Sequence, residues 1–235
     1  DLDKFGYIDR SGKNVIPCTF DVVTPFSEGY AAVANFVSIK DSLILKWNYI
    51  DKKGKVVIEN KFDDALPFHM GKAAVRNENS WEYLNTKGEN SLNGKIFDEC
   101  HSFSNGFAAF CKNQKWGIIR ADGKVILEPA YPVIGAYKNG FFPFSLGPES
   151  FGYLDSTGKI VIQPEYKAVS GFSKGFAFVV KESKLSIINS NGKIICENRF
   201  DSAPGYFGSF LGFVDTPLNT FVEKHRSPIE STVNF

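Results

Sequence analysis

One segment of the chain has the residue pattern of a catalytic nucleophile. Gly171-Phe172-Ser173-Lys174-Gly175 matches Gly-x-Ser-x-Gly, in which a serine on a sharp strand-to-helix turn attacks a carbonyl carbon with help from a histidine base. The same position in neighbouring segments holds Ser27, His69, Ser104 and Lys138. A recurring turn therefore explains the match, and the sequence predicts no serine hydrolase at this position.

A second pattern is similar to a phosphate-binding loop. Gly6, Gly117 and Gly152 each precede a Gly-Lys pair, but the gap is one residue too long for such a loop. Where the loop needs a Ser or Thr to contact magnesium, the chain has Asn14, Val125 and Ile160. A hairpin turn accounts for these glycines, so we expect no nucleotide site.

The remaining reactive side chains form no catalytic or metal-binding set. His69, His101 and His225 share no ligand spacing. Neighbouring carboxylates such as Asp63 and Asp64 point to opposite faces of a strand and make a poor acid–base pair. We therefore expect no catalytic residue, no metal and no cofactor.

The four cysteines show no Cys-x-x-Cys spacing. We expect buried free thiols, and disulfides between distant parts of the chain remain an alternative. The residues are Cys18, Cys100, Cys111 and Cys196.

Composition excludes several classes of partner. Among 235 residues, 27 Lys and Arg balance 26 Asp and Glu, which argues against a nucleic-acid binder and against a polybasic membrane binder. No apolar run approaches the ~18 residues of a membrane helix, so we expect no membrane insertion. The unusual feature is an aromatic content of 15%.

An internal repeat explains most of these aromatics. Similar segments recur at steps of 42, 34, 35, 35 and 34 residues, and no helical apolar stripe runs through any of them. The first unit is about eight residues longer than the others. The six units start at Phe5, Trp47, Trp81, Trp116, Phe151 and Leu185.

Each unit has the pattern of three short strands. An aromatic strand leads into Asp-x-x-Gly-Lys, which favours a type I turn followed by a left-handed residue, and a β-branched strand follows. An aromatic anchor, an aromatic-x-x-Gly turn and an alanine-rich third strand complete the unit. In the second unit these parts are 47–50, 51–55, 56–58, Phe62, 68–71 and 73–75.

The sequence thus predicts an all-β protein of six tandem, three-stranded antiparallel repeats of about 35 residues. We expect the third strand of one unit to pair with the first strand of the next. The sheets would form a curved, propeller-like ring or an open β-solenoid. The ring is favoured because the chain begins on a first strand and the sixth unit ends near Val214 on a third. Residues 1–215 are predicted to form one array, and 216–235 a tail or linker.

The segment WGIIRADGKVILEPAYPVI, followed by the aromatic-x-x-Gly turn, resembles the WG-repeat (KWG-repeat) family. The resemblance covers residues 5 to about 214, although an intact Trp-Gly pair occurs only at Trp116-Gly117 and the sixth unit is the most degenerate. It implies a bacterial protein, often extracytoplasmic, that is used for binding. The family carries no catalytic residues that could be transferred to this chain.

Departures from the repeat indicate where contacts with a partner would form. The first unit contains an insertion, Ala34–Lys46, which predicts a long hairpin that turns near Lys40-Asp41-Ser42. The insertion either folds back on the array or caps it, or it protrudes as a contact surface. Its apolar residues are Phe36, Val37, Ile39, Leu43, Ile44 and Leu45.

Two further departures lie in the middle of the chain. The run that begins with Phe141 and Phe142 is one of them: Phe142 stands where other units mostly have Ala, which indicates either local repacking or an aromatic platform for a ligand. In the third unit, Asn90-Ser91-Leu92-Asn93 replaces the β-branched strand, so that sheet is expected to have a frayed or water-facing edge.

The recurring residues all have structural roles, which favours a non-enzymatic interaction scaffold with a protein partner. A carbohydrate or cell-wall binding module is the alternative, because repeated Trp and Tyr near Asn and Asp suit sugar stacking. This second hypothesis requires solvent-accessible indoles at Trp47, Trp81 or Trp116. An enzyme with a site in a groove or at a ring centre is the third.

Overall fold

The structure is a computed structural model that describes residues 4–39, 42–182, 184–200 and 210–211. Every regular element in this part of the chain is a β-strand, as predicted. It contains no candidate for a membrane-spanning helix. The chain divides into two compact units, Asp1–Pro129 and Ala130–Phe235, and the division falls within one strand.

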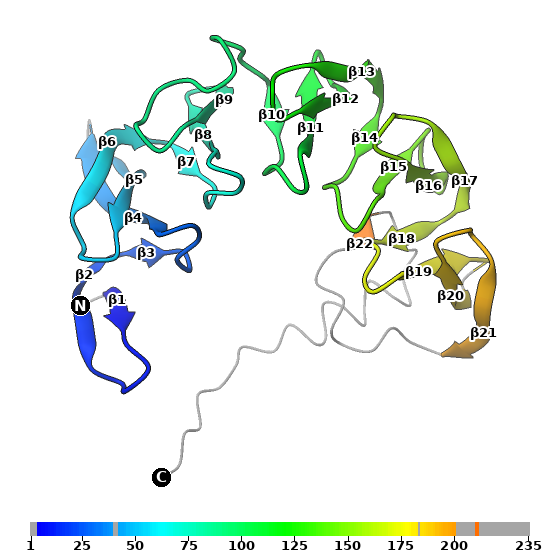
Figure 1. Cartoon of the computed structure of the whole chain (residues 1–235), viewed down its shortest axis with the longest axis horizontal. Coiled ribbons are helices and arrows are strands. Elements are labelled where there is room, and N and C mark those ends of the chain that lie inside the picture. Colours follow the sequence, from blue (N-terminus) through cyan, green and yellow to red (C-terminus); the bar gives the residue numbers. More distant parts are fainter. Residues whose placement is uncertain (1–3, 40–41, 183, 201–209, 212–235) are drawn as a thin grey trace. The chain divides into compact units, whose positions relative to one another are not determined.

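The first compact unit contains four small sheets, which Figure 1 shows from blue to green. They are β1-β2, β3-β4-β5-β6, β7-β8-β9 and β10-β11-β12-β13. The strands are β1 Phe5–Ile8, β2 Asn14–Phe20, β3 Val22–Val23, β4 Tyr30–Ile39, β5 Ser42–Asp51, β6 Val56–Phe62, β7 Asp64–Ala65, β8 Ala73–Asn77, β9 Ser80–Leu84, β10 Glu99–Cys100, β11 Phe107–Lys112, β12 Lys115–Arg120 and β13 Val125–Tyr131.

The second compact unit contains two sheets, with the orders β14-β15-β16-β17 and β21-β20-β19-β18-β22. The strands are β14 Val133–Ile134, β15 Phe142–Ser145, β16 Phe151–Leu154, β17 Ile160–Tyr166, β18 Ala168–Ser170, β19 Phe176–Lys181, β20 Lys184–Asn189, β21 Ile194–Phe200 and β22 Phe210–Leu211. The predicted third strand near Val214 and the predicted tail 216–235 lie outside the described residues.

The predicted pairing between successive repeats is confirmed. Strand β11 ends the third repeat and pairs antiparallel with β12, which begins the fourth, from Phe107↔Arg120 to Lys112↔Lys115. A two-residue strand that the sequence pattern did not reveal adds a further edge strand to the sheet, as β10 does beside β11. Three of the six described sheets therefore contain four strands and one contains five, rather than the three expected.

The Asp-x-x-Gly-Lys turn has the predicted geometry. In the second repeat, Gly54 has a φ of 79°, and its N–H donates to the carbonyl oxygen of Asp51 at 2.9 Å. The Asp51 Oδ1 accepts hydrogen bonds from the N–H groups of Lys53 and Lys55 at 2.8 and 3.0 Å. The carboxylate thus satisfies the backbone of its own turn, which is a structural role.

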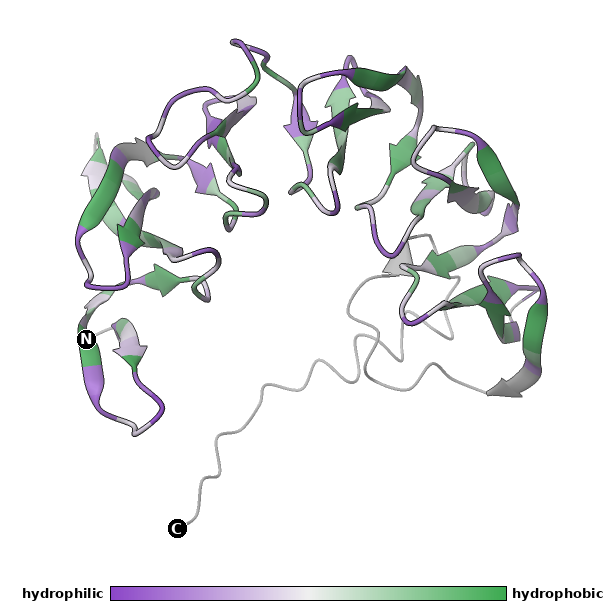
Figure 2. Cartoon of the chain, viewed as in Figure 1, coloured by the Kyte–Doolittle hydropathy of each residue, from purple (hydrophilic) through white to green (hydrophobic). Residues whose placement is uncertain are grey.

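The aromatic columns form the cores of the sheets. In the second repeat, Tyr49 and Phe68 are fully buried with ring centroids 4.9 Å apart, and the Tyr49 hydroxyl donates to the carbonyl oxygen of Leu66 at 2.7 Å. Tyr153 repeats the arrangement with Phe172 and the carbonyl of Ser170. Hydrophobic residues follow the strands while the connecting turns are hydrophilic (Figure 2).

These buried tyrosines make stability sensitive to alkali. Burial raises the pKa of Tyr49, Tyr83 and Tyr153 above the ordinary value, while an unfolded tyrosine titrates near pH 10. Because the pKa of these hydroxyls is higher in the folded than in the unfolded chain, the stability that the neutral tyrosines contribute is complete below about pH 10. That contribution is lost as the pH rises above this value. We expect the urea midpoint to fall between about pH 10 and 12, and less steeply for Tyr153→Phe. An unchanged midpoint across this range would contradict the prediction.

The third repeat departs from the others, as its sequence indicates. Its sheet has three strands, and Asn90 begins a turn in which the Asn90 Oδ1 accepts hydrogen bonds from the N–H groups of Leu92 and Gly94, both at 2.9 Å. The Leu92 side chain, 2% exposed, is buried in the adjoining core. The turn therefore replaces the strand without leaving the core open.

Candidate functional site

The insertion in the first repeat is a long hairpin, as predicted. Strands β4 and β5 pair continuously from Tyr30↔Asp51 to Ile39↔Ser42. Lys40 and Asp41, where the sequence predicts the turn, lie outside the described residues. Two other repeats close the same hairpin after two residues, at Glu78–Asn79 between Asn77 and Ser80 and at Asn113–Gln114 between Lys112 and Lys115.

The base of the hairpin is anchored like an ordinary turn. The Asp21 Oδ2 accepts a hydrogen bond from the Phe36 N–H at 3.0 Å. The corresponding carboxylate of Asp63 accepts from the N–H of the turn residue Glu78 at 2.7 Å. Phe36 therefore occupies the place where a turn begins in another repeat. The strands continue for several residue pairs beyond the sheet's ordinary edge.

The hairpin extension carries apolar side chains on both faces. Cross-strand pairs share a face, so Phe36 lies beside Leu45 on one face, and Val37 lies beside Ile44 on the other. Phe36, Ile39 and Leu43 are 46, 46 and 73% exposed, while Val37, Ile44 and Leu45 are half-buried. We call these six residues the hairpin patch.

The structure places the other two predicted surface residues in packed environments. Phe142 is fully buried and its ring centroid lies 4.6 Å from that of Tyr137. Phe141 is half-buried, with its ring centroid 4.3 Å from that of Phe172. Phe142 therefore offers no surface to a ligand, because it fills the core position that a smaller residue occupies elsewhere. The geometry of both rings agrees with local repacking.

The serine of the nucleophile-like motif lies in a tight turn. Ser173 and Phe176 exchange two backbone hydrogen bonds around Lys174 and Gly175, both of which have positive φ. Four other repeats form the same turn, at Ser27, His69, Ser104 and Lys138. Within the described part of the chain, no cluster of three His, Cys, Asp or Glu could hold a metal ion.

The cysteines are all free thiols, but only Cys100 and Cys111 are buried. Burial raises the pKa of Cys100 to about 12, and the reactive form of a cysteine is the thiolate. We expect an aromatic disulfide reagent to modify the exposed Cys18 first in the native protein, and Cys100 only after unfolding. Mass mapping of the labelled peptides measures this order, with Cys18→Ser as the control. Equal native rates at the two residues would contradict it.

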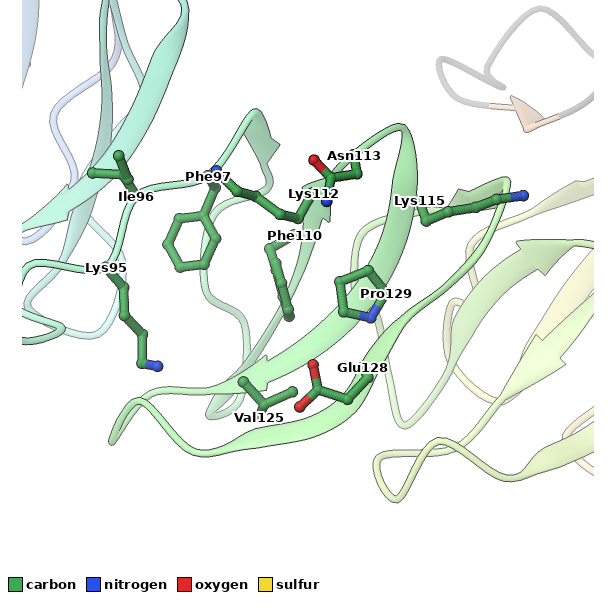
Figure 3. A pocket seen from close by; sticks show the side chains of 10 residues that line it. All are labelled: Lys95, Ile96, Phe97, Phe110, Lys112, Asn113, Lys115, Val125, Glu128 and Pro129. Atoms are coloured by element: carbon green, nitrogen blue, oxygen red, sulfur yellow. The ribbon is translucent and has the colours of Figure 1, made fainter.

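Two clefts open on the first compact unit. The larger, about 510 Å³, has Phe97, Phe110 and Pro129 among its lining residues. Figure 3 shows Lys95 and Lys115 on opposite sides of it, so these two ammonium groups do not converge on one point.

The smaller cleft, about 350 Å³, lies between the sheets of β7–β9 and β10–β13. Trp81 and Trp116 line it and are both half-buried, together with Arg76 and His101. The sequence pattern predicts no role for Arg76, and His101 has no metal-ligand spacing to the other histidines. Arg76 and His101 stand out only when residues at equivalent positions of the repeats are compared.

The repeat family is decided by comparison with known families. The model for the WG containing repeat matches residues 5–35, 47–81, 83–116, 116–147 and 151–184. The chain belongs to the WG-repeat family. The sixth predicted repeat, from Leu185, is not among the five matches.

Solved structures similar to this WG-repeat chain are distant from it in sequence. BamB from Moraxella catarrhalis is 11% identical, with a TM-score of 0.45 over 84% of this chain and 80% of that one. Hsv2p from Kluyveromyces lactis is 10% identical, with a TM-score of 0.46 over 74% and 63%. No curated protein matches the chain.

Proposed function

We propose that this WG-repeat chain is a non-enzymatic scaffold that binds a protein partner through the hairpin patch. The observation that supports it is the exposure of Phe36, Ile39 and Leu43 on strands that extend beyond their sheet. Large exposed apolar groups gathered in one place favour an interaction site over ordinary surface.

Both faces of the hairpin extension are apolar, which determines the kind of contact we expect. A two-stranded ribbon on its own is only marginally stable in water, and burial of its faces would stabilise it. Full burial of one large apolar side chain contributes about 1.5–3 kcal/mol. A partner that encloses the ribbon between two apolar surfaces would use both faces at once.

The proposal extends to the arrangement of the repeats. We take the array to comprise six repeats over residues 1–215, curved as a propeller-like ring or an open solenoid, with 216–235 as a tail. The periodicity of the sequence supports this arrangement. In such an array the consensus residues build the sheets, and binding depends on residues that differ between repeats.

The repeats themselves provide the variant that tests the proposal. Replacing residues 36–45 with Asn-Gly would restore the short turn of the second repeat, because Asp21 already lies where Asp63 anchors that turn. Leu43→Ser removes only the most exposed side chain of the patch. Leu146→Ser is the matched control, since Leu146 is 54% exposed and lies outside the hairpin.

The experiment is affinity capture from cells of the source organism, followed by titration of the purified partner. We expect the wild-type chain and Leu146→Ser to bind the same protein, the short-turn variant to lose it, and Leu43→Ser to weaken it about tenfold. Equal binding by the short-turn variant would refute the hairpin as the site. Substrate turnover that a single substitution abolishes would refute the non-enzymatic assignment.

A further inference from the structure

The cleft lined by Trp81 and Trp116 combines consensus and non-consensus residues. The two tryptophans begin successive repeats, so the fold places one on each of two adjacent sheets, in β9 and β12. Each indole has an apolar body and one N–H donor. Neither ring is fully buried, although Trp81 packs partly against the core of the first compact unit.

Arg76 is unusual for its position in the repeat. It pairs across the strands with Trp81, the first residue of the third repeat. In other repeats, the residue that pairs with the first residue of the next repeat is small or apolar. The equivalent residues are Ala34, Cys111, Ser145 and Val180. A guanidinium at this position is not needed for the fold.

His101 is equally unusual for its position. Its carbonyl oxygen accepts a hydrogen bond from the Tyr83 hydroxyl at 2.6 Å. Three other repeats have an equivalent tyrosine, and the residue whose carbonyl accepts from that tyrosine is the equivalent of His101. Those positions hold Thr24, Leu66 and Ser170. The imidazole is therefore a second side chain that the repeat does not require.

Both side chains are held against the tryptophans. The guanidinium carbon of Arg76 lies 6.0 Å from the ring centroid of Trp81, and its Nη1 donates to the carbonyl oxygen of Glu78 at 2.9 Å. The imidazole of His101 stacks on Trp116, with centroids 4.9 Å apart and planes 18° apart. Side chains fixed in this way lose little conformational entropy when a ligand binds.

The charge of the cleft limits the class of ligand. Glu78, Asp98 and Glu99 line it, and their carboxylates disfavour an anion. A cation is disfavoured as well, because Arg76 already lies over Trp81. A purely apolar ligand would take water away from these charged groups and offer them no hydrogen bond in return.

A neutral saccharide fits the remaining chemistry. Its hydroxyl groups donate to carboxylates and accept from a guanidinium, while the C–H face of the sugar ring packs on indole. A volume of about 350 Å³ lies at the lower end of the range for ligand sites, which suits a short segment of a chain. We infer that this cleft binds a neutral oligosaccharide. The site is independent of the hairpin patch.

The variants use residues that the repeats already tolerate. Arg76→Ala introduces the residue that pairs with Trp47, and His101→Ser introduces the residue found at Ser170. Trp116→Phe introduces the ring that begins the repeat at Phe151. Trp47→Phe makes the same change outside the cleft and is the matched control.

The probes are cellotetraose, maltotetraose and tetra-N-acetylchitotetraose, titrated by calorimetry and by tryptophan fluorescence. We expect at least one to bind at millimolar concentration or below, and Arg76→Ala, His101→Ser and Trp116→Phe to weaken it about tenfold or more. Trp47→Phe and the short-turn hairpin variant should bind like the wild type. Circular dichroism establishes that each variant is folded.

Several results would overturn the inference. One is that none of the three neutral probes binds at millimolar concentration. Another is that the wild type and the cleft variants bind a probe equally. A third is that the chain prefers tetragalacturonic acid, an anionic oligosaccharide, to the neutral sugars. Loss of sugar binding in the short-turn variant would also overturn it, because the hairpin would then be the sugar site. Failure of the protein-partner proposal leaves these expectations unchanged.

Discussion

Gly152→Ala is expected to destabilise the second compact unit by about 3 kcal/mol or more. A Cβ at this position would lie 2.4 Å from the carbonyl oxygen of Ile162 and 2.8 Å from the nitrogen of Pro164. Both obstacles are backbone atoms of the neighbouring strand β17, so no side-chain rotation relieves the overlap. Either β17 moves away from β16, or the backbone of both strands distorts.

Gly147→Ala is the matched control, since it lies in the same compact unit and its Cβ would meet no atom within 4 Å. Substitutions of this kind usually change stability by less than about 0.5 kcal/mol. Urea unfolding followed by circular dichroism gives both midpoints. Similar midpoints for the two variants would show that β16 and β17 do not approach as closely as the structure has them.

This close approach explains the glycine of the Trp-Gly pair and could not be read from the sequence. Gly117 has the same relation to the carbonyl oxygen of Leu127, at 2.5 Å. The third repeat has Glu82 at this position, and there a turn that begins at Asn90 replaces the second strand. Asn48 and Ser186 occupy the position beside the complete second strands β6 and β21, so the close approach that requires glycine is a feature of some repeats and not of all. Periodicity locates the repeat, but the need for glycine arises from a contact between two strands.

The sequence predicted local features well because each depends on a few neighbouring residues. The turn at Asp51–Gly54, the pairing of one repeat with the next and the length of the first hairpin are all confirmed. The two-residue edge strands, such as β10, escaped prediction because two residues show no alternation. Their partners come from a strand several residues further along the chain.

The candidate sites were predicted only in part. The insertion in the first repeat is visible as extra length, so the hairpin patch could be named from the sequence. Phe142 could not be placed correctly, because a large ring in an alanine position has the same signature whether it is buried or exposed. Arg76 and His101 became informative only when strand pairing showed which residues occupy the same position in other repeats.

Phe172→Ala is expected to cost about 3–5 kcal/mol, the usual range when a buried phenylalanine is truncated. Phe172 is 1% exposed, and its ring centroid lies 4.3 Å from that of Phe141 and 4.8 Å from that of Tyr153. Since a domain is stable by only about 5–15 kcal/mol, this loss removes a large share of the total. Phe176→Ala is the control, because Phe176 is 47% exposed in the same compact unit and should cost about 1 kcal/mol or less.

The loss should spread over two sheets, because the Phe172 segment connects them. Its ring packs on Tyr153 of β16, its carbonyl oxygen accepts a hydrogen bond from the Asn139 Nδ2 at 2.6 Å, and its turn leads directly into β19. In a repeat array, stability depends on contacts between neighbours as much as on each repeat alone. Amide hydrogen exchange should therefore accelerate in both β16 and β19 of Phe172→Ala, and in neither strand of Phe176→Ala. Acceleration of exchange confined to β19 would mean that each sheet opens independently of its neighbour. If the alanine variant does not fold, Phe172→Leu gives the same test, because it leaves a smaller cavity.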